Sequence, residues 1–253
     1  MRLVVFTQNE TLFLAQAIDM FCRRLPDHIN IVGAIVLDAS PFGGKRSFYQ
    51  KAYETLKIFG IGFILKYGFA DVWNRLFSDD VVKTLKKHRV PILKDMGSIN
   101  SSDSITKIQS LQPDLCVSIT ANQIFKRQLL DIPTKGTLNL HTALLPKYRG
   151  LMPAFWALKN GEQETGVSVF LMDEGIDSGP ILVQKRIKLQ GLTLWELIRA
   201  TKFIGIEALV ESIEKIDSGD LSFIEIDKSL ASYYSFPTRK DVVAFRQSGK
   251  RFF

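Results

Sequence analysis

The chain has 253 residues, of which 46% are hydrophobic and 23% are charged, ordinary values for a soluble globular protein. This length allows one large domain, or one domain with an appendage. The first apolar run has only four residues before polar ones follow, which argues against a signal peptide, and no stretch is long enough to span a membrane. We therefore expect a cytoplasmic protein. Its net charge of +7 favours acidic partners: nucleotides, phosphorylated sugars, polyglutamylated cofactors or nucleic acid.

The cysteines and two of the three histidines give no sign of a metal or redox site. Cys22 and Cys116 lie in apolar runs without metal-ligand spacing, as expected for small core residues in a reducing compartment. His28 and His88 have surface-like neighbours and lack further ligand residues at suitable spacing. We therefore expect no metal.

The first 135 residues alternate between apolar strands and amphipathic helices, which predicts a doubly wound, Rossmann-like and mostly parallel α/β sheet. Ligands of such sheets bind beyond the carboxyl ends of the strands. The first strand-to-helix turn, TQNET, lacks the G-x-G-x-x-G pattern of dinucleotide-binding proteins. The expected strands are 2–7, 31–37, 90–93 and 115–120, and the expected helices are 11–24, 79–88 with Ser78 as its cap, 100–111 and 123–130.

A segment rich in both aromatic and basic residues, 43–77, interrupts this alternation. Its glycines at positions 60, 62 and 68 would break one long helix, so we expect a helical insert made of two short helices. Two interpretations stay open. The insert is either an amphipathic hairpin that packs on the body or, through residues 44–77, an element that contacts a membrane surface or a partner.

The next strand, Thr137–His141, carries the first candidate functional residues. Side chains two positions apart in a strand point to the same side, so Asn139 and His141 project together while Leu140 faces the other way. An amide donor beside an imidazole can stabilise an oxyanion and move a proton. The pair alone is a weak signal, because most N-x-H sequences are structural.

The sequence after this strand strengthens the signal. The loop 144–150, LLPKYRG, combines proline, glycine, tyrosine and two cations at the end of a strand, which suits an anionic substrate. A helix at 152–161 and a strand at 166–172 follow. The turn after them, DEGIDSGP, holds three carboxylates interleaved with glycines, whereas a plain hairpin needs only one Asx-Gly pair.

These residues carry a family resemblance. The run NLHTALLPKYRG, followed by ETGVSVFLMDEGIDSGPIL, resembles the folate-dependent formyltransferases, which include glycinamide ribonucleotide, methionyl-tRNA and sugar-nucleotide N-formyltransferases. The resemblance is strong over residues 113–190 and weaker over 1–112. Asn139 and Asp177 lie 38 positions apart, as the family pattern requires.

The resemblance implies that Asn139, His141 and Asp177 are the catalytic residues, with N10-formyltetrahydrofolate as donor and a primary amine as acceptor. Asn139 and protonated His141 would stabilise the tetrahedral oxyanion. Asp177 would keep His141 charged and relay the proton of the amine through water. Neither a covalent enzyme intermediate nor a metal is implied.

The resemblance also implies the binding segments. Backbone groups in the segments 120–125 and 172–176 would bind the pterin edge of the donor. Ile124, Phe125 and Ile176 would form apolar walls of the pocket, unless one of them belongs to the core. Where the family commonly has Ser, this chain has Ala143, which places a hydrogen bond near the acceptor in doubt. The implied donor residues are Thr120, Asn122, Gln123, Ile124, Phe125, Met172, Asp173, Glu174, Gly175 and Ile176, and the implied acceptor residues are Pro146, Lys147, Tyr148, Arg149 and Gly150.

The remaining sequence predicts a strand at 180–189, a long helix capped by Thr193 and ended by Gly219, and a short helix opened by Thr238. We expect a catalytic domain over 1–220, with the insert 43–77, and a C-terminal extension over 221–253. The extension would pack on the domain or form a homodimer interface. It has too few strands for the tRNA-binding barrel of methionyl-tRNA formyltransferases.

The leading hypothesis is therefore an N-formyltransferase whose acceptor is a small phosphate-bearing amine, an amino sugar on a nucleotide or a similar carrier. Nucleic acid is not expected as a partner. The alternatives are an activity like that of the methionyl-tRNA or glycinamide ribonucleotide formyltransferases, hydrolysis of formyltetrahydrofolate, and a non-catalytic module that binds tRNA or a membrane surface.

Overall fold

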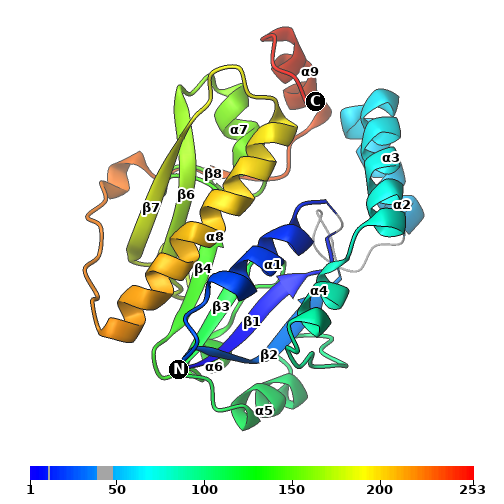
Figure 1. The fold of residues 1–253 in the computed structure, drawn as a ribbon. Coiled ribbons are helices and arrows are strands. Elements are labelled where there is room, and N and C mark those ends of the chain that lie inside the picture. The colour runs from blue at the N-terminus through cyan, green and yellow to red at the C-terminus, as the bar shows by residue number, and fades with distance from the viewer. Residues whose placement is uncertain (11, 39–47) are drawn as a thin grey trace.

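A six-stranded sheet forms the centre of the molecule (Figure 1) in the computed structural model, which describes residues 1–10, 12–38 and 48–253. The strand order is β2-β1-β3-β4-β6-β7; the first four strands run parallel, β6 is antiparallel to β4, and β7 is antiparallel to β6. This confirms the predicted doubly wound, mostly parallel α/β class. The strands are β1 Arg2–Gln8, β2 Asn30–Leu37, β3 Leu115–Ile119, β4 Thr137–His141, β6 Glu164–Leu171 and β7 Ile181–Lys188.

Helices cover both faces of the sheet because successive strand residues point to opposite sides. On β1, Leu3 and Val5 pack in the cluster that holds α1 (Leu14–Arg24), α4 (Val81–Lys87) and α8 (Leu194–Ser218). Val4 and Phe6 belong to the other cluster, with α5 (Ser102–Ser110) and α6 (Arg127–Leu130). Thus β1 is buried on both faces, as its apolar sequence predicts.

The cap of α4 differs from the predicted one. Asp80, not Ser78, accepts a hydrogen bond from the backbone N–H of Lys83, at 2.7 Å. Ser78 instead ends the preceding helix, since its N–H donates to the carbonyl of Asn74 at 2.9 Å. The prediction was wrong because Ser and Asp are both good caps and the sequence does not separate them.

Two other predicted elements are shorter than expected. In 90–93, only Ile92 forms a bridge, with Ala34, and Pro91 has no N–H to donate, so no strand forms. The predicted helix 123–130 contains only α6, at its end. Asn100 prevents an earlier start because its side-chain Nδ2 donates to the carbonyl of Ile124 at 2.8 Å.

The last part of the chain crosses the body and forms a second, two-stranded sheet. Here β5 (Arg149–Gly150) pairs in parallel with β8 (Tyr233–Tyr234), a contact that we did not predict. The remaining elements are α2 Phe48–Phe59, α3 Ile61–Phe77, α7 Pro153–Lys159, the 3₁₀ turn Lys228–Leu230 and α9 Arg239–Gln247.

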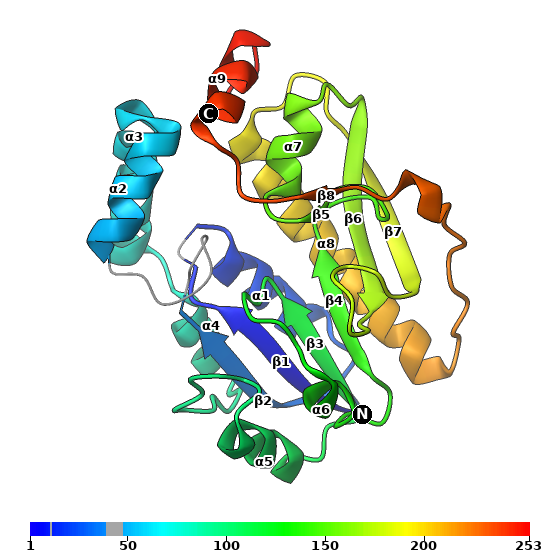
Figure 2. The ribbon, with the colours of Figure 1, turned by 180° about the vertical axis from the view of Figure 1, so that it is seen from behind.

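The insert forms two helices, as predicted, although residues 43–47 lie outside the described residues. Gly60, with φ of +84°, separates α2 from α3, whereas α3 continues through Gly62 and Gly68. Both helices stand beside the sheet, next to α9 and the C-terminus (Figure 2). Arg246 of α9 holds them there, because its guanidinium donates to the carbonyl of Phe59 at 2.7 Å.

Candidate active site

The strand β4 presents Asn139 and His141 on one face, as the sequence predicts. Leu138 and Leu140 point to the opposite face and pack in the core beneath α8. The contact with α8 is close, because a Cβ added at Gly205 would lie 2.8 Å from a methyl group of Leu140. Leu140 thus fixes the strand, and Asn139 and His141 are left on the side away from α8.

His141 lies between two hydrogen-bond acceptors and is 7% exposed. Its Nε2 is 2.8 Å from the backbone carbonyl of Tyr148, and its Nδ1 is 3.6 Å from Oδ2 of Asp177. A carbonyl only accepts, so the hydrogen of that bond belongs to Nε2. The 3.6 Å separation between Nδ1 and Oδ2 is too long for a hydrogen bond.

Asp177 is placed by its own turn and by the loop after β4. Its Oδ2 accepts a hydrogen bond from the N–H of Gly150 at 2.9 Å, and its backbone is left-handed, with φ of +49°. Within the turn, Oδ1 of Asp173 accepts from Gly175 N–H at 2.9 Å and from the Ser178 hydroxyl at 2.6 Å. The Asp173 carboxylate thus ties the turn together just before Asp177.

Asn139 differs from the other two, because its side chain is half-buried and forms no hydrogen bond with any described residue. In the sheet it lies beside Ser118 on β3 and Phe170 on β6. Its amide is therefore available to a ligand on this face, whereas both nitrogens of His141 already face protein acceptors.

In the predicted acceptor loop, 146–150, some side chains are tied into the structure and others are left available. The Tyr148 hydroxyl donates to Glu162 at 2.8 Å, and its ring stacks on Tyr234 with centroids 5.2 Å apart. Burial raises the pKa of Tyr148, so this hydroxyl stays protonated at neutral pH. Arg149, by contrast, has a buried Nε without a hydrogen-bond partner among the described residues.

Two residues of the C-terminal segment support this loop and were missed in the sequence. The Ser232 hydroxyl accepts from Tyr148 N–H and its carbonyl from Arg149 N–H, both at 2.9 Å. The carbonyl of Tyr234 accepts from Leu151 N–H at 2.8 Å. Only a run of aromatic residues marks this segment in the sequence, and no local pattern announces pairing across 84 positions.

The predicted donor residues after β3 have unequal roles. Thr120 has φ of +60°, unusual for a β-branched residue, and its buried hydroxyl has no partner among the described residues. Gln123 ties neighbouring loops, because its Oε1 accepts from Ile99 N–H at 3.0 Å. Phe125 is a core residue, 3% exposed and edge-on to Phe6, so it does not form a pocket wall.

The remaining predicted donor residues are more accessible. The Nδ2 of Asn122 donates to the carbonyl of Asp38 at 2.7 Å. Ile124 and Ile176 are 70% and 51% exposed, and Glu174 is exposed as well. These two isoleucines stay as candidate apolar walls.

The predicted turn crosses the Asn139 face of β4. It begins where Met172 N–H donates to the carbonyl of Thr137 at 2.7 Å, and it ends with Asp177 at His141. The end of β3 reaches the same place, since Ile119 pairs with Leu140. The two predicted donor segments therefore flank Asn139 and His141.

The position that departs from the family pattern, Ala143, is fully buried in the aromatic cluster that includes Phe155. Ser168 fixes the loop backbone here, because its hydroxyl donates to the Ala143 carbonyl at 2.7 Å and accepts from Leu145 N–H at 3.0 Å. The Ala143 side chain therefore faces the core.

The other reactive side chains, two histidines and a cysteine, are paired with carboxylates or buried. Burial raises the pKa of the Cys116 thiol to about 12, which leaves it a poor nucleophile. His28 pairs with Asp217 at 2.6 Å, and His88 pairs with Asp19 at 2.7 Å. Among the described residues, no three His, Cys, Asp or Glu side chains gather as a metal site would require.

The sequence model of a known family, described as formyl transferase, matches residues 70–213, more than half of the chain. This chain belongs to the formyl transferase family. A methionyl-tRNA formyltransferase of Kosmotoga olearia is 32% identical over 71% of this chain and 58% of its own length. The chain spans about half the length of the curated relatives that it matches.

Solved structures share the fold at low sequence identity. An N-formyltransferase of Helicobacter canadensis, in complex with folinic acid and dTDP-3-aminofucose, has a TM-score of 0.57 and 16% identity over 94% of this chain and 71% of that chain. A phosphoribosylglycinamide formyltransferase of Bacillus halodurans has a TM-score of 0.60 and 19% identity over 86% and 96%. Both likenesses place the chain in the formyltransferase fold.

Proposed function

We propose that this protein transfers a formyl group from N10-formyltetrahydrofolate to a primary amine. One observation carries the proposal: Asp177 meets His141 at one end of β4, beside an Asn139 amide with no hydrogen bond to a described residue. In the reaction, a bond forms between the amine nitrogen and the formyl carbon, and the bond from that carbon to N10 breaks. One proton moves from the amine to N10.

The three side chains divide this work. Asn139 donates a hydrogen bond to the formyl oxygen, which becomes negative as the amine attacks. His141 is held by Tyr148 and Asp177, and its protonated ring adds positive charge near that oxygen. Asp177 receives the proton of the amine through water, a general base role that suits a largely buried carboxylate beside a histidine.

The donor fits the groups that flank this face. The Thr120 hydroxyl is buried without a partner among the described residues, and so suits the polar edge of a pterin. Ile124 and Ile176 offer exposed apolar side chains for its ring. Asn122, Gln123, Met172, Asp173, Glu174 and Gly175 complete the two proposed donor segments, through their backbone or by holding the loops.

For the acceptor, we infer a phosphate-bearing amino sugar. Lys147 and Arg149 lie on the loop beside the three catalytic residues and carry positive charge for a phosphate. The Arg149 Nε has no hydrogen-bond partner among the described residues, and the Lys147 Nζ lies 3.8 Å from Glu162. A fold relative was solved with an amino-sugar nucleotide. We assign this chemistry to residues 1–220 and the support of the loop to 221–253.

A second acceptor has an observation of its own. The curated relatives in sequence are methionyl-tRNA formyltransferases, and the chain carries a net charge of +7. Methionyl-tRNA therefore stands as the alternative acceptor, against our expectation that nucleic acid is not a partner.

The test is to incubate the protein with N10-formyltetrahydrofolate and separate amines, and to detect formylated products by mass spectrometry. The amines are amino-sugar nucleotides, glycinamide ribonucleotide and methionyl-tRNA. We expect a product with an amino-sugar nucleotide. A product with methionyl-tRNA alone would change the assigned acceptor from an amino sugar to methionyl-tRNA. Formate released without any amine would indicate a hydrolase, and no product at all would indicate a non-catalytic module.

A further inference from the structure

One side of α3 carries a row of apolar side chains that the described residues leave largely exposed. Its members recur every three or four residues, so they share one side of the helix. We call this set the outer face. It consists of Ile61, Leu65, Phe69, Val72, Trp73, Leu76 and Phe77, which are between 53% and 70% exposed.

The opposite side of α3 is packed, so the outer face cannot simply turn inward. Phe63 stacks on Phe59 with centroids 4.6 Å apart and lies 5.3 Å from Phe252. Tyr67 is 6.5 Å from Trp195, at the start of α8. These rings fix which side of α3 faces outward.

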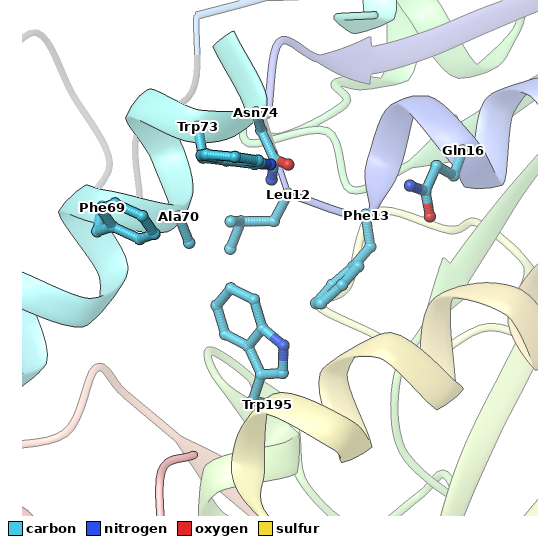
Figure 3. A pocket seen from close by; sticks show the side chains of 8 residues that line it. All are labelled: Leu12, Phe13, Gln16, Phe69, Ala70, Trp73, Asn74 and Trp195. Carbon is cyan, nitrogen blue, oxygen red and sulfur yellow. The ribbon is translucent and has the colours of Figure 1, made fainter. Parts of the chain in front are cut away.

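A pocket of about 380 Å³ joins the outer face to the body of the protein. Phe69 and Trp73 of α3 form one side, and Leu12, Phe13 and Trp195 form the other (Figure 3). Leu12 and Phe13 come soon after β1, so the pocket lies at the carboxyl edge of the sheet, the edge at which β4 ends. The apolar surface therefore reaches the end of the molecule that carries the candidate active site.

Four cations border this apolar surface on the side of the C-terminal segment. Lys66 of α3 lies with Arg246, Lys250 and Arg251 around a second hollow, of about 300 Å³. None of the described residues that line it is Asp or Glu. The Nζ of Lys66 lies 5.1 Å from the ring centre of Phe253, and the guanidinium carbon of Arg246 lies 5.4 Å from that of Phe252, so two of the cations lie over aromatic rings.

We propose that the outer face of α3 and this cationic cluster dock the protein on the surface of an anionic lipid bilayer. An apolar helix face with Trp and Phe, flanked by Lys and Arg, is the composition that inserts at the headgroup boundary. The cations complement acidic headgroups. Within the described residues, none of the helices has the length and apolar character needed to cross a bilayer, so α3 would lie along the surface.

Charge favours a bilayer over a second copy of this chain as the occupant. The cluster and the net charge of +7 would repel an identical surface, whereas they attract acidic lipids. The proposal does not depend on formyl transfer, because docking is measured without donor or acceptor.

The experiment is co-sedimentation of the full chain with vesicles of phosphatidylcholine alone or mixed with phosphatidylglycerol. We expect binding to the mixed vesicles that weakens as salt rises, because the cations are screened. The double variant Trp73→Glu/Phe77→Glu should lower the partition coefficient by about tenfold or more, since it places charge on the apolar face. Lys250→Glu/Arg251→Glu should also lower the partition coefficient, but only for the vesicles that contain phosphatidylglycerol.

The matched control is Leu221→Glu/Phe223→Glu, which changes two exposed apolar residues (52% and 42%) of the C-terminal segment outside the outer face. It should bind like the wild type, and circular dichroism should show the same fold in all variants. The proposal is overturned if the wild type binds neither kind of vesicle, or if Trp73→Glu/Phe77→Glu binds the mixed vesicles as strongly as the wild type does. A dimer that this variant dissociates, without vesicle binding, would instead assign the outer face to a second copy.

Discussion

The loop 145–150 and the helix α3 both lie at the carboxyl edge of the sheet, but they are held in opposite ways. Hydrogen bonds fix the loop backbone from three sides: Ser168 on β6, Ser232 on the C-terminal segment, and Asp177 on the turn. Ring contacts along one side hold α3, and the apolar side chains on its other side are exposed. The difference teaches that a site for chemistry needs a fixed backbone, whereas a docking surface needs only a fixed orientation.

The largest expected effect lies on the loop side. Replacing His141 by Ala should lower the rate of formyl transfer by about 10²- to 10⁴-fold, the usual contribution of a positioned acid–base group. The measurement is tetrahydrofolate release at saturating donor and acceptor. Thermal unfolding of the variant shows whether the fold survives, and a folded variant with the wild-type rate would remove His141 from the chemistry.

The second largest effect is expected from Ser232, which supports the backbone of the loop. Ser232→Ala removes the hydroxyl that accepts a hydrogen bond from the Tyr148 N–H. Tyr148 matters because its own backbone carbonyl holds the His141 ring. We expect kcat to fall by about tenfold to a hundredfold as the ring loses its position. Unfolding in urea should show a loss of about 1 to 3 kcal/mol for the unpaired N–H. Ser229→Ala, in the same segment but not on the loop, is the control and should keep the wild-type kcat.

The two sides of α3 should respond differently to truncation. Phe63→Ala removes ring contacts to Phe59 and Phe252, and should lower the free energy of unfolding by about 1 to 3 kcal/mol. Leu65→Ala, on the outer face and 65% exposed, should stay within about 0.5 kcal/mol of the wild type. Equal losses from urea denaturation would mean that the outer face is packed in solution.

The smallest effect is a pH dependence that comes from Asp19 on α1, outside both regions. The hydrogen bond from His88 lowers the pKa of Asp19 below its usual value of 3.8, so the folded state favours the charged carboxylate. This stabilisation is present above pH 3.8 and is lost as the pH falls through the lower folded-state pKa. Asp19 is 28% exposed, so we expect less than about 1 kcal/mol. Asp19→Asn should flatten the fall in unfolding free energy below pH 4, and an unchanged slope would contradict this.

The sequence predicted what depends on local periodicity. The alternation of Leu138, Asn139, Leu140 and His141 is enough to place two polar side chains together on one face, and the structure shows that placement. Gly219 ends the long helix α8 in a left-handed conformation, again a local property.

The sequence could not predict what depends on contacts across the fold. Pairing of Tyr148 with Ser232 spans 84 residues and has no signal in either segment. Phe125 sits in the core because Phe6 of a distant strand packs on it. The sequence also left open whether the outer face of α3 is exposed, because an apolar helix has the same sequence pattern whether its neighbours cover one side or both.

The single-turnover rate of formyl transfer, with Asn139→Ala and Asp177→Asn compared with the wild type, tests the central claim most directly. Enzyme in excess over N10-formyltetrahydrofolate and an amino-sugar nucleotide makes the chemical step visible. We expect formylated amine with the wild type and rates at least about a hundredfold lower for both variants, whose amide donor or proton acceptor is gone. Folded variants that react as fast as the wild type would contradict the account.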